Sequence, residues 1–173
     1  GLHDLQRFRY AEAAEAFDQA IALNPNFALA YNWRAESAFE QGRFLDMLAD
    51  KEKAYALDPM SLEISADLAY EYRSFWRPED AERVIQRMFD LHPDHVLAYR
   101  AALSNLSSVG RDAETALLAE KAMAAHPDYE TFKDRYAFDL IELGLPDRAL
   151  ARENDDASFS VYMSQGRYQE AKA

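Results

Sequence analysis

Ala-Leu-Asn-Pro at 22–25, Ala-Leu-Asp-Pro at 56–59, Asp-Leu-His-Pro at 90–93 and Ala-Ala-His-Pro at 124–127 decide the fold of this 173-residue chain. Their prolines stand 34 residues apart in each of the three intervals. A fixed interval of this length is typical of a chain built from copies of one supersecondary unit. We therefore expect repetition to govern both fold and function.

Other positions keep the same interval. Gly42, Trp76, Gly110 and Gly144 each follow a proline by 17 residues, and a glycine there suits a turn that needs positive φ. Apolar residues recur at spacings of three and four residues on both sides of these turns, as in amphipathic helices. Each proline then ends a helix, because it lacks an N–H donor and disfavours helical backbone in its predecessor. The sequence predicts an all-α solenoid without strands, with paired helices near 28–41 and 44–57, 62–75 and 78–91, and 96–109 and 112–125.

Two further signals support helical hairpins. Small residues at fixed places, such as Ala35, Ala54 and Ala69, are expected to let neighbouring helices approach closely. After each proline we expect a helix-capping side chain. These expected caps are Asn26, Ser61, Asp94 and Asp128.

The chain resembles the tetratricopeptide repeat family. An aromatic residue opens the first helix (Tyr31, Tyr99), a glycine separates the two helices, and an aromatic residue begins the second helix (Tyr10, Phe44, Tyr168). The resemblance covers nearly the whole chain and implies a right-handed superhelix of stacked antiparallel hairpins. It departs from the family pattern at Trp76, which replaces a turn glycine, and at Ser65 and Lys133, which replace opening aromatics.

The register divides a single array over 1–173 into a partial repeat, three full repeats, a shortened repeat and a truncated one. The first helix of the partial repeat is expected to be a stub over residues 1–7. Neither end carries the polar capping helix that a solenoid needs. The array begins partway through a helix and without an initiating Met, so we expect an excised piece of a longer protein. Its uncapped ends are expected to support homo-oligomers through Leu2–Phe8 or Ala157–Ala173. The repeats are 1–25, 26–59, 60–93, 94–127, 128–153 and 154–173.

Composition limits the partners. The net charge of −12 disfavours nucleic acids and anionic membranes, because both require clustered Lys and Arg. The sequence contains neither cysteine nor an apolar run long enough for a membrane span. We favour a cytoplasmic location, and the excess of Arg over Lys with abundant Ala suggests a bacterial source.

No pattern predicts catalysis or a cofactor. His92 and His95, beside Asp90 and Asp94, have a spacing that suits a divalent metal. We prefer a solvated loop between repeats, because His126 occupies the same loop one repeat later without a partner histidine. The sequence has no Gly-rich phosphate loop, nucleophile elbow or Cys–His pair. We expect no enzyme activity, no metal and no cofactor.

Trp76 lies in the turn Ser-Phe-Trp-Arg-Pro-Glu-Asp (74–80), with Pro78 at the first position of the next helix. We expect its ring to fold back over the end of the hairpin and cover apolar surface. A partner anchor is the alternative, because aromatic residues dominate interface hot spots.

The family resemblance implies that ligands lie along an inner groove lined by the first helix of each repeat. Several of its positions form an apolar trail with acidic neighbours, and a soluble protein rarely leaves such a trail unused. The expected partner-binding residues are Leu29, Asn32, Glu36, Phe39, Glu40, Glu63, Tyr70, Arg73, Leu97, Arg100, Asp134, Phe138 and Ile141.

One variant of the family, the carboxylate clamp, holds a chaperone's C-terminal tail with Lys, Asn and Arg. The corresponding residues here are Asn32, Glu36, Asp67, Leu97 and Ala101, so the clamp is absent. An acidic, partly apolar groove favours a basic amphipathic segment of a protein partner. We expect a protein-binding scaffold, with a regulatory or self-association module of a larger multidomain protein as the alternative.

Overall fold

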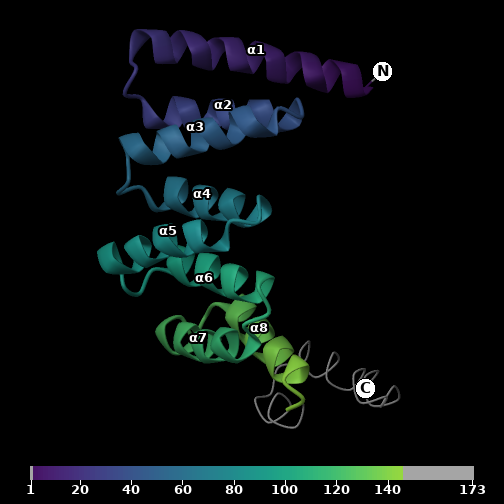
Figure 1. The fold of residues 1–173 in the computed structure, drawn as a ribbon, viewed down its shortest axis with the longest axis vertical. Helices are drawn as coiled ribbons and strands as arrows, with labels where there is room; N and C mark the ends of the chain where they lie inside the picture. The colour runs from purple at the N-terminus through teal and green to yellow at the C-terminus, as the bar shows by residue number, and fades with distance from the viewer. Residues whose placement is uncertain (1, 146–173) are drawn as a thin grey trace. The chain divides into compact units, whose positions relative to one another are not determined.

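The chain is all α-helical in its described part. The structure, a computed structural model, describes residues 2–145, with side chains from residue 9 onward. No strand is present among these residues (Figure 1). The helices are α1 (Leu2–Leu23), α2 (Ala28–Glu40), α3 (Phe44–Leu57), α4 (Leu62–Ser74), α5 (Pro78–Leu91), α6 (Val96–Ser108), α7 (Asp112–Ala125) and α8 (Glu130–Glu142).

The predicted hairpins are confirmed, and α2 to α7 begin and end within one residue of the predicted positions. The expected stub is wrong, because α1 runs without a break from Leu2 to Leu23. Phe8 stands 34 residues before Gly42, so the sequence there has no glycine to end a helix. The single array and its repeat boundaries stay predictions. The shortened and truncated last repeats extend beyond the described residues.

Each turn between paired helices contains one residue with left-handed backbone. Gly42, Gly110 and Gly144 have φ of 74°, 70° and 71°. Trp76 takes the same place in the α4–α5 turn with φ of 56°, and Pro78 begins α5 as predicted. The repeat therefore imposes a left-handed turn even where the sequence does not supply glycine.

The helix caps differ from expectation. Ser61 caps α4 as predicted, and its side chain accepts a hydrogen bond from Ile64 N at 3.3 Å. The predicted caps Asn26, Asp94 and Asp128 are wrong, because each of these helices starts one residue later than that cap would require. The N-cap residues of α2, α6 and α8 are instead Phe27, His95 and Tyr129.

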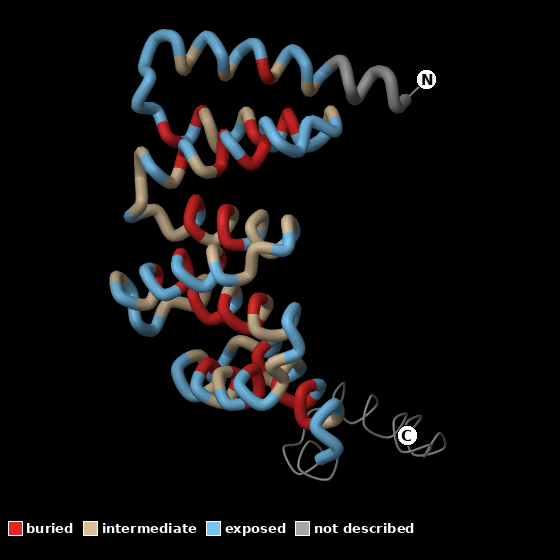
Figure 2. Tube along the Cα trace, viewed as in Figure 1, coloured by how far each residue is buried: buried red, intermediate tan, exposed pale blue. Residues whose placement is uncertain are grey.

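Two compact units divide the chain at a predicted repeat boundary, and each is described by itself. Unit 1 covers Gly1–Pro93 and unit 2 covers Asp94–Ala173. In unit 1, α4 packs on the α2–α3 hairpin through two small cores. Figure 2 shows buried residues, in red, along α2, α3 and α4. One core contains Ala28, Ala54 and Ile64, and the other contains Ala35, Ala38 and Met47 with Phe75 against it.

Unit 2 has a more aromatic core. Phe132 of α8 is 1% exposed, and its ring centroid lies 6.1 Å from Tyr99 of α6 and 4.7 Å from Tyr129. His126 closes the group and its Nε2 lies 2.6 Å from the Asp94 carbonyl oxygen. Small buried residues, Ala98, Ala119 and Ala122 among them, bring the helices together as predicted.

Candidate functional site

The predicted partner-binding residues of unit 1 lie on the first helices of two successive hairpins. From α2, Leu29 and Phe39 are about half exposed, Glu36 and Glu40 are exposed, and Asn32 is half-buried. From α4, Glu63 and Tyr70 are exposed and Arg73 is half-buried. We call these residues, together with Asp67 and Glu71, the α2/α4 face.

An ion-pair network crosses this face. The amide of Asn32 donates to Asp67 Oδ2 at 3.1 Å, which joins α2 to α4. The ammonium of Lys51, from α3, donates to the same Asp67 oxygen at 3.1 Å and also to Glu36. Lys51 is only 1% exposed, whereas the side chains of Glu36 and Asp67 are 58% and 44% exposed. A buried cation therefore lies beneath exposed carboxylates.

Lys51 was missed by the sequence reasoning because second helices were assigned to packing. A signal was present. The residues one repeat away from Lys51 on either side are Phe17 and Ile85, and Ala119 follows one repeat later. A lysine at a position that is otherwise apolar indicates a buried charge, which requires partners.

The carboxylates of the face outnumber its buried cation. Glu71 lies near Glu36, Asp67 and Lys51, and it is half-buried. Burial raises the pKa of Glu71, the charge of Lys51 opposes this, and the charges of Glu36 and Asp67 raise it further. Glu36 and Asp67 thus pair with one buried ammonium, Glu71 lies within its electrostatic reach, and Arg73 is the other nearby cation. The face carries an excess of negative charge.

Aromatic side chains border the charged network. The guanidinium carbon of Arg73 lies 4.7 Å from the ring centroid of Tyr70, a cation–π contact on the surface of α4. Phe39 meets Phe44 edge to face, with ring centroids 5.7 Å apart. Apolar and acidic groups therefore lie together on the α2/α4 face.

In unit 2, the candidate residues lie on α6 and α8. Arg100, Asp134 and Phe138 are exposed, whereas Leu97 and Ile141 are half-buried. These residues form no network comparable with that around Lys51 among the interactions of the described residues.

The same two helices hold a buried ion pair. Arg135 donates two hydrogen bonds to Asp139, at 3.1 and 2.7 Å, and one to Ser107 Oγ of α6 at 2.5 Å. Burial raises the pKa of Asp139, and the opposing effect of Arg135 is smaller. The hydrogen bond from Arg135 to Ser107 links α8 to α6, so Arg135 has the character of a structural contact.

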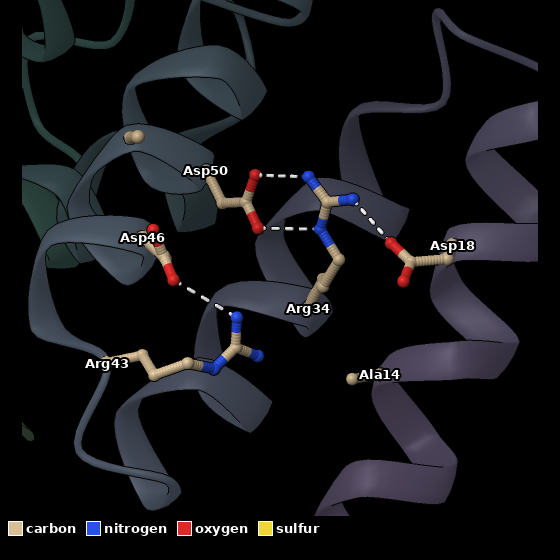
Figure 3. A pocket seen from close by; sticks show the side chains of 7 residues that line it. Ala14, Asp18, Arg34, Arg43, Asp46 and Asp50 are labelled. Carbon is tan, nitrogen blue, oxygen red and sulfur yellow. Dashed lines mark hydrogen bonds and ion pairs between the residues drawn. The ribbon is translucent and has the colours of Figure 1, made fainter.

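Unit 1 also contains a cleft of about 330 Å³ between α1 and the α2–α3 hairpin. Arg34 lines this cleft and donates to Asp50 through Nε at 2.7 Å and through Nη2 at 2.5 Å. Its Nη1 donates to Asp18 of α1 at 2.6 Å, and Arg43 pairs with Asp46 nearby (Figure 3). Because Arg34 already pairs with Asp50 and Asp18, we interpret these ion pairs as a clasp that holds α1 on the hairpin. We do not interpret the cleft as a ligand site.

Two smaller expectations concern loops. The expected packing of Trp76 over the hairpin is wrong, because its side chain is 86% exposed. Nδ1 of His95 accepts a hydrogen bond from Leu97 N at 3.2 Å, so His95 caps α6.

Within residues 2–145, no group of three or more His, Cys, Asp or Glu side chains is arranged to hold a metal ion. None of the described helices is long and apolar enough to cross a bilayer.

Comparison with known proteins supports the repeat assignment. Residues 4–42 match a family model described as TPR repeat. Mouse sperm-associated antigen 1 is 30% identical over 103 residues, which are 60% of this chain and 11% of that protein. The chain therefore spans about a ninth of the length of that relative.

Solved structures align with almost the entire chain. A tetratricopeptide repeat protein from Parabacteroides merdae superposes with a TM-score of 0.71 at 15% identity, covering 96% of this chain and 70% of that one. A structure described as YrrB, a TPR protein with an unusual peptide-binding site, superposes with a TM-score of 0.65 at 16% identity. That match covers 94% of this chain and 81% of YrrB.

Proposed function

We propose that this chain, a tetratricopeptide repeat protein, is a non-catalytic scaffold that binds a basic amphipathic segment of a partner protein on its α2/α4 face. The observation that carries the proposal is the charge imbalance around Lys51, whose buried ammonium pairs with both Glu36 and Asp67 while a third carboxylate, Glu71, lies nearby. A cationic partner would neutralise the excess charge that the protein itself leaves.

Electrostatics supports a basic partner at two levels. The net charge of −12 attracts cations from a distance, which raises association rates and makes them depend on salt. At the surface, Glu40 has no ion pair among the described residues, and Glu63 accepts only a 3.4 Å hydrogen bond from Ser61. These carboxylates are available to a partner's Lys or Arg side chains.

Apolar contacts would supply the binding energy. Leu29, Phe39 and Tyr70 are 48%, 47% and 56% exposed, so each can lose considerable apolar surface to water on binding a partner. Aromatic anchors in such positions commonly carry most of the affinity of an interface. The spacing of Leu29, Asn32 and Glu36 puts them along one side of α2.

The preformed helices α2 and α4 limit the conformational entropy that is lost on binding. Both α2 and α4 are held in place by cores, so the partner alone must become ordered on association. YrrB, which shares the fold, is described as having a peptide-binding site, and peptide binding by this chain remains our proposal. In unit 2 we propose the same role for Leu97, Arg100, Asp134, Phe138 and Ile141.

Calorimetry with designed peptides tests the proposal. The Arg peptide is a capped amphipathic helix of Arg, Leu and Ala, and the Glu peptide replaces each Arg with Glu. We expect the chain to bind the Arg peptide and not the Glu peptide. In the double variant Phe39→Ala/Tyr70→Ala, affinity should fall by about 2 kcal/mol or more.

The matched control is Leu45→Ala/Leu117→Ala, which truncates two exposed side chains on second helices, at 77% and 63% exposure. It should bind the Arg peptide like the unmodified chain. If Phe39→Ala/Tyr70→Ala binds with unchanged affinity while its helicity and melting are intact, the partner uses another surface. The outer side of the second helices then becomes the better candidate.

Charge reversal separates steering from contact. Glu40→Lys/Glu63→Lys should slow association with the Arg peptide and reduce its salt dependence. Glu36 is unsuitable for this test, because it pairs with buried Lys51 and its reversal would also disturb the fold. A salt dependence that is the same in both proteins would contradict electrostatic steering by these two residues.

A further inference from the structure

Trp76 occupies a turn that favours glycine. Its φ of 56° lies in the left-handed region, and the three equivalent residues are Gly42, Gly110 and Gly144. Left-handed backbone is unfavourable for residues with a Cβ, and such strain is often retained at functional positions. The side chain gives no packing in return, because it is 86% exposed.

Besides Phe75, which packs against a core, the end of α4 carries the rings of Tyr70, Tyr72 and Trp76, and two of these three already carry a cation. Arg73 lies over Tyr70 at 4.7 Å, and Arg77 lies over Tyr72 at 4.3 Å. The ring of Trp76 has no hydrogen bond, ring contact or cation–π contact among the described residues. Indole attracts cations more strongly than the other aromatic side chains do. The strongest cation–π acceptor of the three rings is therefore the one without a cation in the described part of the chain.

The charges around Trp76 permit a further cation. Arg77 is neutralised by Asp80 at 2.5 Å and by Glu52 at 3.1 Å. Arg73 makes a cation–π contact with Tyr70, and its charge also interacts with that of Glu71, two residues earlier in the sequence. Glu79, three residues after Trp76 in the first turn of α5, is exposed and has no ion pair among the described residues. It offers a carboxylate three residues along the chain from the ring of Trp76.

We propose that Trp76 and Glu79 form a subsite for a guanidinium or ammonium group of a partner, with the cation stacked on the indole face. The inference rests on the proposed function for the positive charge of the partner. It extends the binding surface from the α2/α4 face to the turn between α4 and α5. A protein of net charge −12 attracts such partners.

Fluorescence isolates the contact, because the chain has two tryptophans, Trp33 and Trp76. In the background Trp33→Phe, emission comes from Trp76 alone. Titration with the Arg peptide should change the intensity or wavelength of this emission. The matched citrulline peptide, which keeps the shape of Arg without its charge, should leave the emission unchanged.

Substitution separates the contact from the fold. Trp76→Gly removes the ring and restores the turn residue of the other repeats, so its melting temperature should equal or exceed that of the unmodified chain. Its affinity for the Arg peptide should fall by about five- to thirtyfold. Trp76→Leu keeps an apolar side chain without a π face, and it should lose nearly as much affinity as Trp76→Gly.

Three results would overturn the inference: Trp76→Leu binding as tightly as Trp76, the citrulline peptide changing the emission as the Arg peptide does, or Trp76→Gly retaining full affinity. If Trp76→Gly keeps its affinity while Phe39→Ala/Tyr70→Ala loses it, the subsite fails and the proposed function stands. If the Arg peptide does not bind the unmodified chain, the proposed basic partner and the subsite are both wrong.

Discussion

Lys51 on α3 donates a hydrogen bond to Asp67 on α4 over 3.1 Å, so the second helix of one hairpin is joined to the first helix of the next. The same ammonium bonds Glu36 of its own hairpin. One side chain thus connects three helices of unit 1 and also sets the charge of the proposed binding face.

Replacing Lys51 should reveal the repulsion among the carboxylates of Glu36, Asp67 and Glu71, which the ammonium of Lys51 offsets. We expect Lys51→Met to lower the free energy of unfolding at neutral pH by about 1 kcal/mol, because methionine keeps the packed stem but leaves the carboxylates without their cation. The loss should shrink at acidic pH, where the carboxylates are protonated. Urea unfolding at both pH values measures it.

Lys53→Met, which changes an exposed lysine of the same helix, is the control and should change stability by less than about 0.5 kcal/mol. A Lys51→Met chain that is more stable than the unmodified one at neutral pH would mean that burying the ammonium costs more than its ion pairs return.

Glu71 gives a pH-dependent prediction. Because its pKa is raised in the folded chain, the charged form is disfavoured there and destabilises the fold above that pKa. We expect Glu71→Gln to raise the melting temperature at neutral pH. The gain should vanish below the unfolded pKa of about 4.3, where both states hold the proton. Glu63→Gln, at an exposed glutamate of the same helix, should show no such gain at either pH.

Gly42 and Trp76 occupy equivalent left-handed turn positions, so opposite substitutions there should change stability in opposite directions. Gly42→Ala should destabilise unit 1 by about 1–2 kcal/mol, since a Cβ there meets no neighbouring atom and the cost is confined to the left-handed backbone. Trp76→Gly should change stability in the opposite direction, by less, because glycine also gains freedom in the unfolded chain. Thermal unfolding of both variants tests the pair. Equal destabilisation by the two changes would show that the ring of Trp76 does stabilise the fold.

The clasp at Arg34 should control the attachment of α1. We expect Asp18→Asn to increase amide hydrogen exchange over residues 9–23 while α4 and α5 keep their protection, because the broken ion pair is the one that reaches α1. Asp46→Asn removes a neighbouring pair that does not involve α1 and serves as the control. Uniform loss of protection across unit 1 would contradict a local clasp.

The periodic features were predictable from the sequence. The intervals between the prolines and between the turn residues predicted the helices from 28 to 125, because proline and glycine act through local backbone geometry. The caps were less predictable, since their position depends on where the first turn of each helix closes. A difference of one residue transferred the N-cap of α6 from Asp94 to His95.

Side-chain direction was the main source of error at the site. A 34-residue register states which helix a residue belongs to, but not that the stem of Lys51 passes under α2 and α4 to reach Glu36 and Asp67. It likewise could not state that the ring of Trp76 points into solvent. Both depend on the volume left by neighbouring helices, which no single repeat determines.

The network around Lys51 also has a consequence for cooperativity. The stability of a repeat protein is approximately a sum of hairpin terms and of coupling terms between neighbouring hairpins. In unit 1 the coupling between the α2–α3 and α4–α5 hairpins contains partly exposed ion pairs, which dissolved salt screens. Rising ionic strength should therefore weaken the coupling between the two hairpins, so that the unfolding transition broadens.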